Sequence, residues 1–138
     1  MNAQEALKKA ALFSNLNKGA LERIASVTNE RSYKPGDVII KEGDRAVAFF
    51  VIVEGKVEVL RGDTSVASFG PGDFFGEMAL FEGYPRSSTV KATTDTKCLV
   101  LTQWDFMAEL RSEPSIAVEM LPIMARRLRA VDARLDEQ

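Results

Sequence analysis

Glycine is distributed very unevenly along this chain of 138 residues. Eight of the nine glycines lie between Gly36 and Gly83, and the two ends of the chain are almost free of them. Because glycine tolerates positive φ angles and marks tight turns, the central interval predicts short strands joined by turns, and the ends can form helices. A chain of this length is typical of one domain. We therefore predict a single α+β domain, mainly β, with helices over residues 1–33, a β-roll over 34–102 and helices over 103–138.

Short apolar segments separated by turn signals supply the strands of this β-roll. Val57 and Val59 alternate with charged neighbours, which is the period of a strand that buries one face. Gly62-Asp63 is a turn signal between two such segments. Short strands at this spacing favour an antiparallel barrel or jelly roll. The predicted strands are Val38–Ile40, Phe49–Val53, Lys56–Leu60, Val66–Phe69, Ser88–Ala92 and Lys97–Leu101.

The first part of the chain has the spacing of amphipathic helices. Apolar residues recur at helical intervals over Gln4–Leu12 and Lys18–Val27. Asn17 has the position and the residue type of an N-cap for the second of these helices. The run Lys34-Pro35-Gly36-Asp37 ends the helical pattern.

The last third of the chain is also helical in character. Gln103–Leu110 is a short amphipathic segment, and Pro114 suits the first turn of a longer final helix. Pro122 lacks an N–H group and is predicted to kink or break that helix. An apolar stripe, which must be covered by something, then runs through Leu121, Met124, Leu128, Val131 and Leu135.

The absence of histidine narrows the chemistry that the chain can perform. It excludes Ser-His and Cys-His catalysis and histidine-ligated metal centres, so we expect no metal site, and any catalysis would have to use carboxylates, lysine, tyrosine or the single thiol. A formal charge of −2 provides no global attraction for DNA. Cys98 is the one cysteine and lies in an apolar run, which predicts a buried thiol in the reducing cytoplasm. No uncharged run approaches the ~20 residues of a membrane-spanning helix, so no membrane insertion is expected.

The densest group of chemistry-bearing residues lies between residues 74 and 90. After a turn at residues 70–73, the segment from Gly76 to Phe81 is long enough for only one or two helical turns. The first amides of such a turn lack a partner within it and can bind an anion. Arg86 stands at the entry of the next strand, where its planar guanidinium can pair with phosphate oxygens. The segment therefore predicts a phosphate site.

Two runs in this segment resemble the phosphate-binding cassette of cyclic nucleotide-binding domains. They are Phe75-Gly76-Glu77-Met78-Ala79-Leu80 and Pro85-Arg86-Ser87-Ser88-Thr89-Val90. The resemblance extends to Lys34–Ile39, Glu42–Asp44, Val53–Val57 and Met124–Leu128, and so covers residues 12–135 or thereabouts. The family includes protein kinase A regulatory subunits, cyclic nucleotide-gated channels and the bacterial catabolite activator. It implies an antiparallel β-roll with a C-terminal helical lid, and a sensor function without catalysis.

The resemblance also implies roles for single residues. The N–H groups of Gly76 and Ala79 and the guanidinium of Arg86 would hold a cyclic phosphate, and Glu77 would accept a hydrogen bond from the ribose 2′-OH. Ser87 would contact the phosphate or the purine. The implied ligand-binding set is Gly76, Glu77, Met78, Ala79, Arg86, Ser87, Ser88, Val131 and Asp132, the last two near the purine.

The implied ligand is cyclic AMP, with cyclic GMP as the second choice, and no further cofactor. A hydroxyl after the cassette arginine, here Ser87, accompanies either nucleotide in the family. By the same resemblance, the final helix moves over the purine as a lid, and its apolar stripe covers the base or pairs with a second copy in a homodimer. The sequence leaves open which effector responds.

Plainer interpretations compete with these. Glu77 could be an acid that favours the first turn of a helix, Arg86 a solvated charge, and the cluster at Arg126, Arg127 and Arg129 a solvated helix face. A metal-dependent jelly-roll enzyme is disfavoured by the missing histidines, and a DNA-binding regulator by the acidic pI of 5.3. A module of the same fold that only dimerises or binds a partner protein, without a ligand, remains the alternative.

Overall fold

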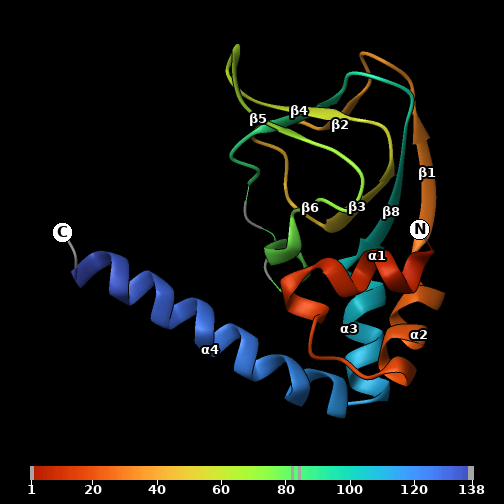
Figure 1. The fold of residues 1–138 in the computed structure, drawn as a ribbon, viewed down its shortest axis with the longest axis vertical. Helices are drawn as coiled ribbons and strands as arrows, with labels where there is room; N and C mark the ends of the chain where they lie inside the picture. Colours follow the sequence, from red (N-terminus) through yellow and green to blue (C-terminus); the bar gives the residue numbers. More distant parts are fainter. Residues whose placement is uncertain (1, 82, 84, 137–138) are drawn as a thin grey trace.

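The computed structural model describes residues 2–81, 83 and 85–136, with their side chains except those of Glu77, Met78, Arg127, Val131 and residues 134–136. Within this part of the chain, strands form two four-stranded antiparallel sheets, and helices gather at one end of them (Figure 1). The strand orders are β1-β8-β3-β6 and β2-β7-β4-β5. The predicted α+β fold, mainly an antiparallel β-roll, is confirmed. The strands are β1 (Asn29–Tyr33), β2 (Val38–Ile40), β3 (Ala48–Glu54), β4 (Val57–Arg61), β5 (Thr64–Phe69), β6 (Phe74–Phe75), β7 (Thr89–Ala92) and β8 (Thr96–Thr102).

Three phenylalanine rings mark the core between the first sheet and the helices. Phe13 meets Phe49 with ring centroids 5.5 Å apart and Phe106 at 6.1 Å, both edge to face. Asn17 caps the second helix by accepting a hydrogen bond from the Ala20 N–H at 2.9 Å, as predicted. The elements around this core are α1 (Ala3–Lys9), the 3₁₀ turn η1 (Ala11–Phe13), α2 (Lys18–Ser26) and α3 (Gln103–Ser112).

A second core lies between the two sheets. Successive side chains of β3 point to opposite faces, so Phe49 joins the core under the helices and Phe50 joins the core between the sheets. Both faces of β3 are therefore buried, which is why the strand is apolar at almost every position. Cys98 is fully buried in the second core, and burial raises the pKa of its thiol to about 12. The prediction of a buried thiol is confirmed.

Two strands depart from the sequence-based assignment. β1 pairs with β8 from Asn29 to Tyr33, so the prediction that helices extend to residue 33 is wrong, and α2 ends at Ser26. The first four residues of β1 are all exposed, so the strand has no apolar alternation and is held by main-chain bonds at the sheet edge. The second, β6, is only two residues long, and it pairs with β3.

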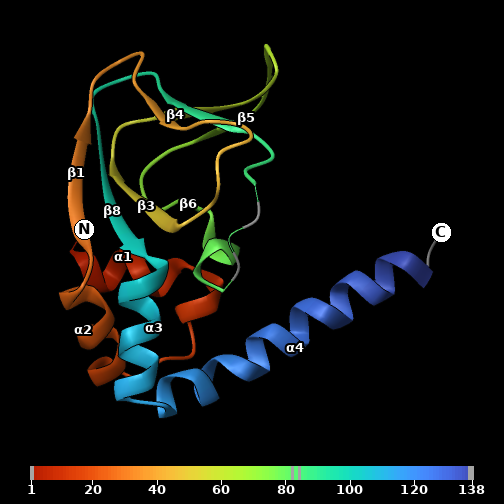
Figure 2. The same ribbon diagram turned by 180° about the vertical axis from the view of Figure 1, so that it is seen from behind.

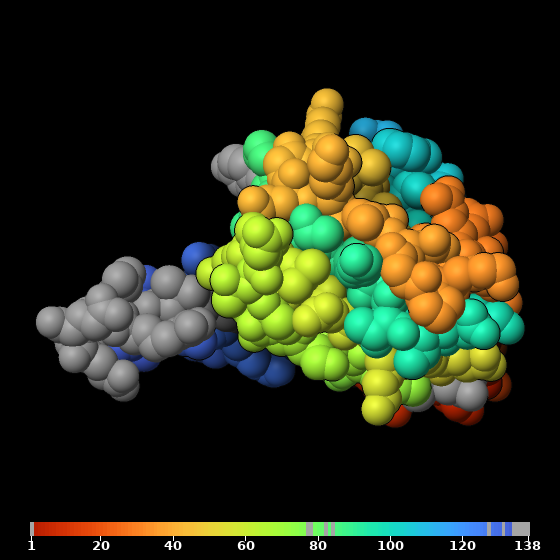
Figure 3. Space-filling model, turned by 90° about the horizontal axis from the view of Figure 1, so that it is seen from above, coloured from red at the N-terminus to blue at the C-terminus, as the bar shows by residue number. Residues whose placement is uncertain are grey.

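The long helix α4 (Ser115–Asp136) has a packed half, residues 115–124, and an outer half, residues 125–136. Ile116, Met120 and Ile123 are buried in the packed half, whereas Leu128 in the outer half is 67% exposed. The helix leaves the body of the molecule and ends away from both sheets (Figures 1 and 2). From above, its blue atoms project from one side of the molecule (Figure 3).

The helix α4 continues without interruption through Pro122, so the predicted break does not occur. Proline removes the N–H that would bond to the carbonyl of Val118. Both Pro122 and Val118 are exposed, so water can bond to that carbonyl in place of the helix. In the part of the chain that the structure describes, no helix has the length and apolar character needed to cross a membrane.

Candidate ligand-binding site

A cavity of about 240 Å³ lies at the β-roll and combines one polar corner with an apolar wall. The polar corner contains four of the predicted ligand-binding residues, Gly76, Arg86, Ser87 and Ser88. The structure thus places residues of both cassette runs at one cavity, Gly76 directly after β6 and the others in the segment that leads into β7. The apolar wall consists of Ile40, Val59, Phe69, Phe75 and Val90.

Gly76 and Arg86 are in direct contact. Gly76 has a φ of +81°, and a Cβ at this position would collide with the Arg86 guanidinium and stand 3.0 Å from the Ala48 carbonyl oxygen. Glycine is therefore required at this position for two reasons. It tolerates the positive φ, and its lack of a side chain leaves the space that the arginine occupies. The Arg86 Nη2 group donates a hydrogen bond to the Ala48 carbonyl oxygen. The guanidinium is thereby placed at the cavity with a defined orientation.

The backbone around Arg86 is fixed by the loop that follows β2. The Arg86 N–H donates to the Asp44 carbonyl at 2.7 Å, and the Gly43 N–H donates to the Arg86 carbonyl at 2.8 Å. The side chain is half-buried, and this burial lowers the pKa of its guanidinium because desolvation disfavours the charged form. A partly desolvated cation of this kind gains from an anionic partner.

The turn after Gly76 is the short 3₁₀ helix η2 (Glu77–Leu80). Its Ala79 N–H donates to the Gly76 carbonyl at 3.0 Å, so this predicted phosphate donor is already engaged within the turn. Leu80 is fully buried in the core under the helices. The Phe81 ring meets Phe106 of α3 edge to face at 5.5 Å. The cassette is therefore packed directly against the C-terminal helices.

Two of the other predicted residues, Ala79 and Asp132, are described by the structure and do not line the cavity. The side chains of Glu77, Met78 and Val131 lie outside the described residues. Ala79 is 3% exposed and is not part of the cavity wall. Asp132 is exposed on the outer half of α4, which points away from the sheets (Figure 2).

The residues of the apolar wall were not predicted from the sequence, although they are more than half of the residues that line the cavity. The alternation of Val57 and Val59 predicted a buried face, and both residues do point inward. Only Val59 borders open space, because Val57 is fully buried in the core between the sheets. Phe75 belongs to the wall through β6, where its ring stacks on Phe50 with centroids 5.1 Å apart. A two-residue strand gives no periodic signal that could have revealed it.

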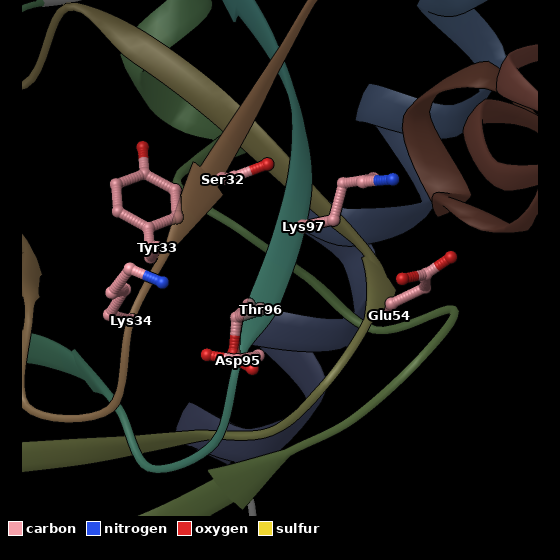
Figure 4. Close-up of a pocket in the computed structure, with 7 residues that line it drawn as sticks. All are labelled: Ser32, Tyr33, Lys34, Glu54, Asp95, Thr96 and Lys97. Carbon is pink, nitrogen blue, oxygen red and sulfur yellow. The ribbon is translucent and has the colours of Figure 1, made fainter.

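A second hollow, of about 230 Å³, lies along β1 and β8 (Figure 4). Tyr33 and Lys34 extend on one side of it, and Lys97 and Glu54 on the other, so their polar groups do not converge (Figure 4). It shares no lining residue with the cavity of Gly76 and Arg86. We therefore place the candidate site at the Arg86 cavity, which suits a ligand that is anionic at one end and apolar elsewhere.

Comparison with known proteins points to the same class of site. The sequence matches the family model of the cyclic nucleotide-binding domain over residues 30–113. It is 33% identical over 135 residues to the cyclic AMP receptor protein of Thermus thermophilus, an alignment that covers 94% of this chain and 62% of that protein. A cyclic nucleotide-gated potassium channel of Rhizobium etli is 42% identical over 106 residues, which cover 77% of this chain and 30% of the channel.

A solved structure supports the fold over almost the whole chain. The N-terminal domain of a transcriptional regulator from Streptomyces coelicolor A3(2) superposes with a TM-score of 0.87 at 32% identity, covering 93% of this chain and 95% of that one. This chain belongs to the cyclic nucleotide-binding domain family. It spans less than two thirds of the length of each of these two curated relatives.

Proposed function

We propose that this chain is a regulatory module that binds a cyclic nucleotide and transmits the binding through movement of α4, without catalysis. The contact between Arg86 and Gly76 at the polar corner of the cavity carries this proposal. A cyclic phosphodiester has one negative charge, which one guanidinium matches. Membership of the cyclic nucleotide-binding domain family supports the same ligand class.

In this proposal the phosphate enters between Arg86 and the turn at Gly76. Arg86 directs part of its guanidinium from the Ala48 carbonyl to a phosphate oxygen. The Ala79 N–H, now bonded to the Gly76 carbonyl, shares its hydrogen with the phosphate. Glu77 accepts a hydrogen bond from the ribose 2′-OH, and Ser87 contacts the phosphate or the purine. The apolar wall packs against the remainder of the nucleotide.

The signal is proposed to pass from η2 to the helices. Phe81 touches Phe106 of α3, and α3 is followed directly by α4. A shift of η2 on phosphate binding therefore pushes on α3 and changes the angle at which α4 leaves the body. The outer half of α4, with Val131 and Asp132, then closes over the base. This is a two-state element whose equilibrium the ligand biases.

Cyclic AMP is the favoured ligand in this proposal, ahead of cyclic GMP. The name of the Thermus thermophilus relative supports it. A dissociation constant in the micromolar range, or about −8 kcal/mol, suffices for a second messenger. The buried, unpaired thiol of Cys98 supports action in a reducing compartment such as the cytoplasm.

Calorimetric titration of both nucleotides tests the site. Arg86→Ala should weaken binding by about 100-fold, because a charge-assisted contact to the phosphate is lost. Glu77→Ala should remove the preference for cyclic AMP over its 2′-deoxy analogue. Arg111→Ala, an exposed arginine on α3, is the matched control and should leave binding unchanged. Unchanged binding in both Arg86→Ala and Glu77→Ala would show that the site assignment is wrong.

A second candidate function is a ligand-free dimerisation or interaction module. The exposure of Leu121 and Leu128 on α4, 63% and 67%, favours it because a partner helix could cover them. Sedimentation analysis together with thermal unfolding separates the two functions. Strong self-association with no change in Tm on addition of either nucleotide would favour the interaction module.

A further inference from the structure

A second arginine, Arg61 at the end of the neighbouring strand β4, is hydrogen-bonded to a residue that lines the cavity. β4 pairs with β7 in register, Val59 opposite Val90, and both of these residues line the cavity. Because side chains alternate along a strand, Arg61 lies on the same face as Val59. Its Nε donates a hydrogen bond to Oγ of Ser88, another lining residue, at 3.4 Å. One guanidinium, that of Arg86, therefore lines the cavity, and that of Arg61 stands beside its rim at Ser88.

The turn that follows Arg61 is tied to the rim of the cavity. The Gly62 N–H donates to the Glu42 carboxylate at 3.3 Å. The Glu42 N–H in turn donates to the Thr89 hydroxyl at 3.0 Å. These bonds connect the end of β4 to the loop after β2 and to the start of β7. The backbone at Arg61 is therefore held in place, although its side chain is exposed.

We propose that Arg61 is a specificity-determining residue that pairs with the purine and raises the affinity for guanine relative to adenine. This inference rests on the proposed function, in which Arg86 holds the phosphate. A guanidinium only donates hydrogen bonds. The Hoogsteen edge of guanine presents two acceptors, N7 and O6, whereas adenine presents one acceptor and an amino donor. The bond to Ser88 uses Nε of Arg61, which in this inference leaves the two terminal nitrogens to donate to the base.

Titration of cyclic AMP and cyclic GMP into Arg61→Ala and Arg61→Lys tests this assignment. Both variants should bind cyclic GMP about tenfold more weakly, because neither offers a planar fork with two donors, and cyclic AMP binding should change less than about threefold. Ser88→Ala should lower cyclic GMP affinity by a smaller factor, since Arg61 loses its acceptor. Arg111→Ala is again the control for loss of an exposed arginine. Unfolding curves that match the wild type establish that each variant is folded.

Three results would overturn the inference. If Arg61→Ala weakened both nucleotides equally and Arg61→Lys restored them, Arg61 would act only as a positive charge. Unchanged cyclic GMP binding in both variants would show that Arg61 does not contact the base. A wild-type chain that bound neither nucleotide would overturn the proposed function itself, and this inference with it.

Discussion

Some of the predicted ligand-binding residues lie at the cavity and others lie on the outer half of α4. The two regions differ in how firmly contacts with the rest of the molecule hold their residues. At the cavity, hydrogen bonds and close contacts lock together residues from distant parts of the chain, such as Ala48, Gly76 and Arg86. On the outer half of α4, Leu128 and Asp132 are exposed. The difference fits the proposed function, in which Arg86 already stands at the cavity whereas the outer half of α4 must be brought to it by a ligand or a second copy.

The largest expected effect is on the free energy of unfolding, and it should differ between substitutions in the two halves of α4. Ile116→Ala should lower the free energy of unfolding by about 3 kcal/mol, because a side chain that is 1% exposed leaves a cavity in the core. Leu128→Ala is the matched change in the outer half and should stay within about 0.5 kcal/mol. Urea denaturation measures both. A comparable loss in Leu128→Ala that depends on protein concentration would mean that a second copy covers the outer half.

Gly76→Ala should destabilise the fold by about 2 kcal/mol and abolish nucleotide binding, because the φ of +81° is strained for alanine and the methyl group displaces Arg86. Gly36→Ala is an informative control. Its φ is +93°, but nothing lies within 4 Å of the added Cβ. It should therefore show strain of about 1 kcal/mol with binding intact. Equal loss of binding in both variants would contradict a preformed contact between Gly76 and Arg86.

Ending the chain after Met124 removes the outer half of α4 and tests its role as a lid. The free energy of unfolding should change by less than about 0.5 kcal/mol, since the described side chains removed are exposed. Cyclic AMP should bind about tenfold more weakly, equivalent to about 1.4 kcal/mol, if the outer half covers the base. Calorimetric titration measures the affinity of the shortened and of the full chain for cyclic AMP. Identical affinities would remove the lid from the proposed mechanism.

The smallest effect concerns pH and the core between the sheets. Burial raises the pKa of Cys98 from 9.0 to about 12 in the folded state. Below pH 9 the thiol is protonated in both the folded and the unfolded chain, so it adds no pH dependence. Above that pH only the unfolded chain releases the proton, and the free energy of unfolding should fall by about 1 kcal/mol between roughly pH 9 and 10. Cys98→Ala should lack this component in denaturation curves, and an identical slope would show that the thiol is hydrated.

Most of the strands could be predicted from the sequence because each carries its own apolar pattern. The predicted strands Lys56–Leu60 and Lys97–Leu101 lie within one residue of the observed β4 and β8 at each end. β1 could not be predicted in this way, since its stability comes from main-chain pairing with β8 and its side chains are polar. Of the kink or break predicted at Pro122, the break does not occur, because a solvent-exposed helix can lose one hydrogen bond to water and continue.

The sequence by itself determined that the middle of the chain forms strands and the ends form helices, and it determined the residue types of the cassette. Local backbone preference and periodicity encode both, as at Gly76, where only glycine suits a positive φ. Only the tertiary structure decided that Arg86 rests on Gly76, that Arg61 bonds to Ser88, and that the outer half of α4 points away from the sheets. These relations depend on sheet register and on how helices pack against sheets, which bring together residues whose separation along the chain carries no local signal.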